Sequence, residues 1–170
     1  MHEFSFQDDI LPLKDKLFRL ALRITMDRAE AEDVVEEAMV RVWEKRESYS
    51  NYDSVEAFCL VVTKNLALDM SQKKDAQNLS LDESMAESEM DESDPYHQLA
   101  NNEKLKLIHR LINELPERQR LVMQLRDIEG ESYKKIALVM NITEAQVKID
   151  IFRARQKVKQ RFLEIDGYGL

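Results

Sequence analysis

The sequence predicts an all-α protein, with two small helical domains joined by a flexible acidic linker. Apolar residues recur at intervals of three and four, the spacing of one helix face. Glycine and proline number only 3 each among 170 residues, and 34% of the residues are charged. Such a composition is typical of helical proteins. Between Asp75 and Tyr96 the chain turns to serine and acidic residues, includes Pro95 and has no lysine or arginine. That segment is too poor in apolar residues to build a core.

The expected N-terminal domain, residues 1–74, contains helices at residues 8–26, from Asp27 to about Lys45, and from Asp53 to about Lys74. Asp27 with Glu30 forms a capping box, and Asp53 with Glu56 caps the third helix. Residues 46–53 are polar and are predicted to be a loop. The predicted inward residues are Leu13, Leu17, Leu20, Ala21 and Ile24 in the first helix, Val34, Val35, Ala38 and Val42 in the second, and Phe58, Val61, Val62 and Leu66 in the third. Trp43 faces either inward with the second set or outward to a partner.

The linker is expected at residues 75–98 and the C-terminal domain at residues 99–170. A helix runs to Leu115, Pro116 suits the first turn of the next helix, and Gly130 ends it. A helix-turn-helix follows, in which Asn141 tolerates a left-handed conformation and Thr143 with Gln146 forms a capping box. Its apolar stripes are Ile136, Ala137 and Met140 in the first helix, and Val147, Ile151, Ala154, Val158 and Phe162 in the second.

The charge is unevenly distributed, although the whole chain carries −8. Residues 1–75 contain 11 Lys/Arg and 16 Asp/Glu. Residues 76–103 contain no Lys/Arg and 8 Asp/Glu, and residues 104–170 contain 14 Lys/Arg and 9 Asp/Glu. The three segments therefore carry −5, −8 and +5. A duplex attracts a local basic face, not a chain average. An ordinary helical hairpin is the alternative, but the cap, the turn and the cationic helix together favour nucleic-acid binding.

Other function classes find little support in the sequence. No segment approaches 18 uncharged apolar residues, and the N-terminus does not resemble a signal peptide. The lone Cys59 excludes an internal disulfide and fits a reducing cytosol, so we expect a cytoplasmic protein with a buried, inert thiol. His2, His97 and His109 lack the spacing of metal ligands. With no phosphate-binding glycine loop or nucleophile elbow, we expect neither enzymatic activity nor a cofactor.

Three segments together resemble a bacterial sigma factor of the extracytoplasmic-function (ECF) group, in the sigma-70 superfamily. Residues 31–43 are similar to the helix that binds core RNA polymerase, residues 64–69 to the promoter-melting and −10 helix, and residues 115–155 to the −35-binding domain. The likeness covers roughly residues 8–163, in the family's order. It implies an initiation factor that binds core polymerase and directs promoter-specific transcription through −10 and −35 recognition.

The resemblance also implies contacts in the N-terminal domain. Asp33, Glu37, Arg41 and Trp43 would dock on the polymerase clamp helices, although Glu37 also fits a solvated acidic face and Trp43 a core position. The loop residues Tyr49, Asn51 and Tyr52 would hold a flipped −10 base, or the tyrosines merely pin the loop to its own domain. The residues implied to meet the −10 strands are Lys64, Asn65, Lys73 and Lys74.

Some positions of this domain depart from the family pattern. Phe58 stands where tryptophan is usual, and Val61 stands where a basic residue is usual. Met70, Ser71 and Gln72 stand where arginines usually follow. Fewer cations imply weaker melting or a reliance on other contacts, and Phe58 fits the core better than a base platform.

In the C-terminal domain the resemblance implies that Lys148, Phe152 and Arg153 meet the −35 element in the major groove. Arginine can bond guanine in bidentate fashion, and phenylalanine can pack on a thymine methyl. Ile149 and Asp150 depart from the family, so its −35 sequence should not be assumed. Asp150 either reads a cytosine or pairs with Arg153 or Lys148, and pairing is favoured. Thr143 and Gln146 are expected to bond phosphate near the helix start. Phosphate or solvent is expected to contact Arg155, Lys157 and Lys159.

One other function stays open, a stand-alone helix-turn-helix regulator whose N-terminal helices dimerise or sense a ligand. The motif at residues 33–43 and the absence of an apparent dimer seam favour the sigma factor. The resemblance alone implies an anti-sigma factor as a further partner, without membrane insertion of this chain. The acidic linker is either a solubilising tether or, as the resemblance implies, a strand that enters polymerase channels lined with cations. Its acidic residues are Asp82, Glu83, Glu87, Glu89, Asp91, Glu92 and Asp94.

Overall fold

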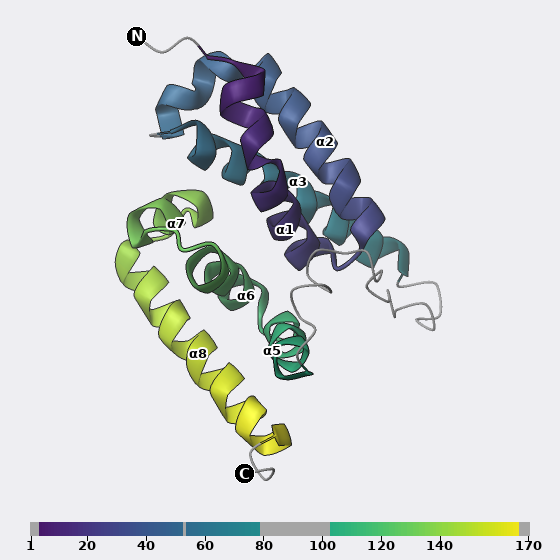
Figure 1. The fold of residues 1–170 in the computed structure, drawn as a ribbon, viewed down its shortest axis with the longest axis vertical. Coiled ribbons are helices and arrows are strands. Elements are labelled where there is room, and N and C mark those ends of the chain that lie inside the picture. The colour runs from purple at the N-terminus through teal and green to yellow at the C-terminus, as the bar shows by residue number, and fades with distance from the viewer. Residues whose placement is uncertain (1–3, 53, 79–102, 167–170) are drawn as a thin grey trace. The chain divides into compact units, whose positions relative to one another are not determined.

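The computed structural model describes residues 4–52, 54–78 and 103–166. Within these ranges the regular structure is helical and no strand occurs, which confirms the all-α prediction (Figure 1). The chain divides into two compact units. Among the described residues, no helix combines the length and apolar character needed to cross a bilayer. The acids predicted to form the linker, from Asp82 to Asp94, lie outside the described residues.

The N-terminal unit begins with two irregular helical turns. A π-helical turn, η1 (Phe6–Ile10), is capped by Ser5, whose Oγ accepts the Asp8 N–H at 3.2 Å. A 3₁₀ turn, η2 (Leu11–Leu13), contains Pro12, which has no N–H to donate to an α-helical ladder. The α-helix α1 (Lys14–Thr25) follows, so only the later part of the helix predicted at residues 8–26 is α-helical.

The second helix has the predicted cap. Helix α2 (Arg28–Glu44) starts after Asp27, whose carboxylate accepts the Glu30 N–H at 3.1 Å. The Glu30 carboxylate is 3.2 Å from Lys74 Nζ, so it forms an ion pair instead of completing the box. The predicted inward residues are buried and Trp43 is half-buried. The buried residues of α2 are Ala31, Val34, Val35, Ala38, Met39 and Val42.

The segment predicted as a loop is a 3₁₀ turn, η3 (Arg46–Tyr52), and it leads into α3 (Val55–Asn78). The predicted cap Asp53 lies outside the described residues, and Ser54 Oγ accepts the Ala57 N–H at 3.1 Å. Helix α3 continues past Lys74, so the first residues assigned to the linker are helical.

The inward face predicted for α3 is only partly right. Phe58 is buried, but Val61, Val62 and Leu66 are half-buried. Helices α1, α2 and α3 each pack on the other two, so α3 buries a broad face around Leu60. Val61 and Val62 are left at its edge. The residues of α3 that are buried are Ala57, Phe58, Cys59, Leu60, Thr63 and Ala67.

Cys59 lies inside this bundle as a free, fully buried thiol. Burial raises the pKa of its thiol to about 12. The thiolate, which is the reactive form, is therefore not populated near neutral pH. The prediction of an inert core cysteine agrees with this position.

The C-terminal unit contains α5 (Glu103–Asn113), α6 (Glu117–Met123) and a π-helical turn, η4 (Gln124–Ile128). Pro116 occupies the cap position, one residue before the predicted first turn. Gly130, with φ +74°, ends this segment as predicted, and its N–H donates to the Arg126 carbonyl at 3.0 Å. A left-handed φ of this kind carries little strain in glycine.

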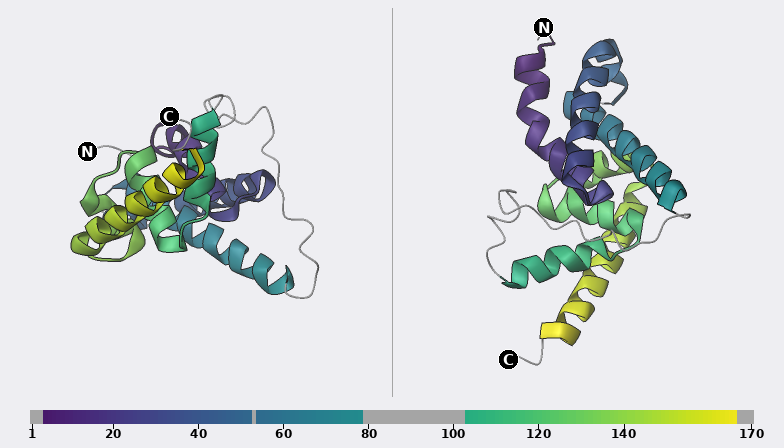
Figure 2. Two further views of the ribbon diagram at one scale, coloured as in Figure 1. Left: turned by 90° about the horizontal axis from the view of Figure 1, so that it is seen from below. Right: turned by 90° about the vertical axis from the view of Figure 1, so that its right-hand side faces the viewer.

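The helix-turn-helix consists of α7 (Tyr133–Met140) and α8 (Glu144–Asp166). As predicted, Asn141 is left-handed with φ 56°, and Thr143 Oγ1 accepts the Gln146 N–H at 3.0 Å. Ile136 is buried, whereas Ala137 and Met140 are half-buried. Helix α8 is one continuous rod that packs on α5 and α6 (Figures 1 and 2). Its predicted stripe is confirmed by the burial of Val147, Ile151, Ala154 and Val158, with Phe162 half-buried.

Candidate nucleic-acid interface

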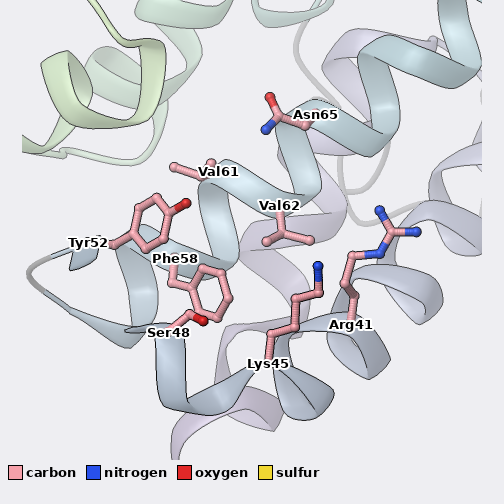
Figure 3. A pocket seen from close by; sticks show the side chains of 8 residues that line it. All are labelled: Arg41, Lys45, Ser48, Tyr52, Phe58, Val61, Val62 and Asn65. Carbon is pink, nitrogen blue, oxygen red and sulfur yellow. The ribbon is translucent and has the colours of Figure 1, made fainter. Parts of the chain in front are cut away.

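A pocket opens in the N-terminal unit where α2, η3 and α3 meet (Figure 3). Its volume is about 320 Å³, at the lower end of the range of small-ligand sites. The rings of Tyr52 and Phe58 stack at 5.0 Å with an interplanar angle of 15°. The pocket residues are Arg41, Lys45, Ser48, Tyr52, Phe58, Val61, Val62 and Asn65.

The pocket combines an apolar wall with cations at one side. Figure 3 shows Arg41 and Lys45 extending from α2 towards α3, while the Tyr52 and Phe58 rings lie at the η3 end. Arg41 Nη2 is 2.7 Å from Glu37 Oε1, and Lys45 is exposed. Aromatic rings stack on nucleobases, and cations attract the phosphates beside them. The pocket thus places an aromatic ring, an apolar wall and two cations side by side.

Helix α2 presents a second surface, away from the bundle core. Asp33, Glu36 and Glu37 are exposed around Val40, which is 54% exposed. Arg28 Nε is 3.3 Å from Glu32 Oε1, so part of the charge is paired within the helix. Surface ion pairs contribute little to the stability of the fold, so this exposed face is available to a partner.

Trp43 does not belong to that surface. It is half-buried, with the rings of Phe4 and Phe6 each at a centroid distance of 6.0 Å. The Arg46 guanidinium lies 4.2 Å from the centre of its ring. Trp43 is thus held mainly by contacts within its own unit, which favours a core position over a polymerase contact.

On α8 a cationic stripe flanks an exposed aromatic residue. Lys148, Phe152, Arg155 and Lys159 recur at spacings of four, three and four, so they lie along one face. Phe152 is 64% exposed. Tyr133 of α7 adjoins the stripe, and Lys148 Nζ lies 5.6 Å from the centre of its ring. Cations around an apolar side chain on one exposed helix face suit entry into a major groove.

Arg155 is already bonded within the unit. Its Nε and Nη2 lie 3.0 and 2.5 Å from the two carboxylate oxygens of Asp127. This hydrogen bonding raises the pKa of Arg155, which stays charged. The pair fixes the guanidinium on the outer face of α8 and neutralises part of its charge, so Arg155 attracts phosphate less than an unpaired arginine would.

Asp150 is paired, but not with the residues considered from the sequence. It is 1% exposed, and Arg118 Nε of α6 lies 2.8 Å from its Oδ2. Gln146 Nε2 donates to its Oδ1 at 3.0 Å. Neither Arg153 nor Lys148 is its partner, because Asp150 points to the buried side of α8. A buried carboxylate on that side is also unable to reach a base.

Comparisons with known proteins decide the family. The sigma-70 region 2 family model matches residues 10–77, and the sigma-70 region 4 model matches residues 105–158. The chain belongs to the sigma-70 family, in its ECF group. It is a sigma factor, and as such it directs RNA polymerase to promoters.

Several proteins resemble this sigma factor over most of their length. ECF RNA polymerase sigma factor SigM of Bacillus subtilis is 28% identical, over 84% of this chain and 86% of the relative. RNA polymerase sigma-H factor of Pseudomonas aeruginosa is 28% identical, over 88% of this chain and 83% of the relative. The solved structure of the sigma factor RpoE of Bartonella quintana, in complex with the anti-sigma factor NepR, has the same fold. Its TM-score is 0.78 at 22% identity, over 95% of this chain and 98% of that chain.

The structure separates the residues predicted for −10 contact. Tyr52 and Asn65 line the pocket, while Tyr49 is 37% exposed and packs on Phe4 with a centroid distance of 5.5 Å. The side chain of Asn51 lies outside the described residues. Lys64 is half-buried and Lys73 is exposed. Lys74 is engaged at the start of α2, 3.7 Å from Asp27 and 3.2 Å from Glu30.

The residues predicted for −35 contact lie mainly on the outer face of α8. Thr143, Lys148, Arg153 and Lys157 are exposed with Phe152 and Arg155. Gln146 is half-buried, and its amide group is bonded to Asp150. Of the residues predicted to dock on polymerase, Asp33 and Glu37 lie on the exposed acidic face, whereas Arg41 also lines the pocket.

Some site residues were not identified from the sequence. Lys45 and Ser48 line the pocket, and Tyr133 adjoins the α8 stripe. Lys45 follows Arg41 by four residues, so helical spacing alone would have placed both cations on one face. Tyr133 gave no such signal, because only the turn between α7 and α8 brings it near Lys148.

The Arg118–Asp150 pair leads to a testable asymmetry. Arg118→Ala leaves a buried carboxylate without its cation and should destabilise the C-terminal unit by about 1–3 kcal/mol. Asp150→Ala should cost less, because the side chain of Arg118 is 50% exposed and can be solvated by water. Hydrogen exchange of α8 amides measures both effects, with the exposed Arg110→Ala as control. A larger loss for Asp150→Ala than for Arg118→Ala would contradict this account.

Proposed function

We propose that this sigma factor recognises promoters through two separate sites: the pocket of the N-terminal unit takes an unpaired −10 base, and α8 reads the −35 duplex. The observation that supports this most is the pocket itself, because its stacked Tyr52 and Phe58 lie beside Arg41 and Lys45. A duplex-binding regulator has no need for a pocket that fits a single base.

At the −10 element, a base leaving the stack would lose pairing and stacking energy, a cost of a few kcal/mol. Contact with the Tyr52 ring and with Val61 and Val62 would offset part of this cost, since base–aromatic stacking contributes about 1–3 kcal/mol. Lys45 and Arg41 would lie near the strand's phosphates. The departure at Val61, where a basic residue is usual in the family, thus supplies an apolar wall instead of a cation.

At the −35 element, α8 would enter the major groove with Phe152 central to its exposed face. Lys148 and Arg153 flank Phe152 and are able to reach base edges. Lys157 and Thr143 would contact phosphates, which orient the helix without reading sequence. Arg155 and Gln146 would contribute less to DNA binding, because Asp127 and Asp150 already bond their polar groups.

Core polymerase would dock on the acidic face of α2, through Asp33, Glu37 and the exposed Val40. The sigma factor would perform no catalytic step and would act in the cytoplasm with the polymerase. Two solved relatives of the same fold are described in complexes, RpoE with the anti-sigma factor NepR and CnrH with the cytosolic domain of CnrY. An anti-sigma factor is accordingly a proposed partner of this chain as well.

Transcription in vitro tests the function as a whole. The chain, mixed with bacterial core polymerase and a genomic DNA library, should yield discrete transcripts whose start sites share upstream elements. Core polymerase alone, on the same library, is the control. If the chain instead shifts duplex DNA by itself as a dimer and starts no transcripts, it is a stand-alone regulator.

The docking face gives a second prediction. Asp33→Lys or Glu37→Lys should weaken core binding, while stability changes by only about 0.5 kcal/mol because both residues are exposed. Asp15→Lys, an exposed acid on α1, is the matched control for charge reversal. Binding is measured by a pull-down on immobilised core polymerase. Wild-type affinity in both α2 variants would exclude this face.

The exposed face of α8 gives a third prediction. Arg153→Ala should cost roughly 1–3 kcal/mol of binding to the −35 duplex and relax preference at one or two base pairs. Lys157→Ala should weaken binding to specific and random DNA alike and reduce the salt dependence by about one unit of slope. Fluorescence anisotropy at several salt concentrations separates the two. If Arg153→Ala loses the same affinity for specific and for random DNA, Arg153 does not contact bases.

A further inference from the structure

The N-terminal segment, residues 4–10, joins α2 to the η3 turn through aromatic rings. Phe4 contacts both Trp43 of α2, at a centroid distance of 6.0 Å, and Tyr49 of η3, at 5.5 Å. Phe6 contacts Trp43 edge-on, with an interplanar angle of 90°. Among the described residues, Phe4 is therefore the ring that links the end of the polymerase-docking helix to the turn beside the pocket.

The segment is held in place by its own local bonds, so Phe4 has a defined position. Ser5 Oγ accepts the Asp8 N–H at 3.2 Å, and the Ser5 N–H donates to Asp9 Oδ2 at 2.7 Å. These bonds close the first turn of η1, as in a capping box. Ile10, at the end of the turn, is fully buried and anchors the segment on the bundle.

The η3 turn also carries part of the pocket. Ser48 and Tyr52 line it, and Tyr49 lies between them in sequence. Tyr52 is secured on one side by its stack with Phe58, and Tyr49 on the other by Phe4. A 3₁₀ segment of 7 residues is longer than most, and its hydrogen-bond geometry is poor, so side-chain contacts of this kind help to stabilise it.

We propose that Phe4 is a positioning residue for the base pocket, which it holds open for an unpaired base by fixing η3 through Tyr49. The proposal rests on the proposed function of that pocket. A turn that is ordered before the base arrives avoids the entropy cost of ordering it during binding. Phe4 touches no DNA and acts through Tyr49.

The test compares Phe4→Ala with Phe6→Ala in reconstituted holoenzyme. Both variants remove a ring from Trp43, but only Phe4→Ala releases Tyr49. Promoter opening is measured by permanganate reactivity of unpaired thymines, on a promoter recovered by the library transcription experiment. Phe4→Ala should lower opening about three- to tenfold, the change in an equilibrium constant that corresponds to one lost aromatic pair. Phe6→Ala should open the promoter like wild type.

Controls separate positioning from stability. Phe4→Tyr keeps the ring and should restore opening. Trp43 is the only tryptophan of the chain, so its emission reports the aromatic cluster directly, and both alanine variants should shift it. Binding to a −35 duplex and to core polymerase should not change in either variant.

Two results would overturn the proposal: wild-type opening in Phe4→Ala, or an equal loss in Phe6→Ala, which would assign the effect to general packing around Trp43. Failure of the proposed function is distinguishable from both. In that case Tyr52→Ala, which removes a ring of the pocket itself, would open the promoter like wild type.

Discussion

Burial of one apolar stripe on each helix is the constraint on which the other features depend, because it decides which face of each helix is left for a partner. On α8, Val147, Ile151, Ala154 and Val158 face the unit. Lys148 and Phe152 must then point outward, since residues one position apart lie about 100° apart around the helix. On α2 the same rule buries Val34, Val35, Ala38 and Val42 and leaves Asp33 and Glu37 exposed.

The placement of individual acids explains how an acidic chain presents a basic surface. Asp150 lies on the buried side of α8 with Arg118, so it does not oppose the cations of the outer face. Asp127 is bonded to Arg155 of that face and neutralises part of the charge of this one residue. The exposed Lys148, Arg153, Lys157 and Lys159 keep a local positive charge, which is what a phosphate backbone meets. The exposed acids of α2 belong to the other unit, where a protein partner is proposed.

Aromatic residues of the N-terminal unit connect the end of α2 to the turn beside the pocket. Trp43, at the end of α2, is in contact with Phe4, and Phe4 with Tyr49 of the turn that carries Ser48 and Tyr52. The end of α2 is thereby joined to the pocket turn through packed rings, in addition to the ion pair between Glu37 of the proposed docking face and Arg41 of the pocket. Aromatic contacts of this kind are little affected by salt, unlike the phosphate contacts proposed for α8.

The sequence by itself determined the helical fold, the caps at Asp27 and Thr143, the turns at Gly130 and Asn141, and the stripe of α8. These features depend on neighbours within a few residues, where backbone geometry and helical spacing act directly. Exposure of Lys148, Phe152 and Arg153 followed from the same spacing. Sequence motifs also indicated the family.

Only the tertiary structure decided the features that depend on residues far apart in the chain. The partner of Asp150 is Arg118, 32 positions away, so no helical spacing could have identified it. Val61 and Val62 line a pocket because α1 and α2 occupy the other faces of α3. Phe4 reaches Trp43 and Tyr49 across the unit. Local patterns carry no information on such contacts, because several elements must pack together before the residues meet.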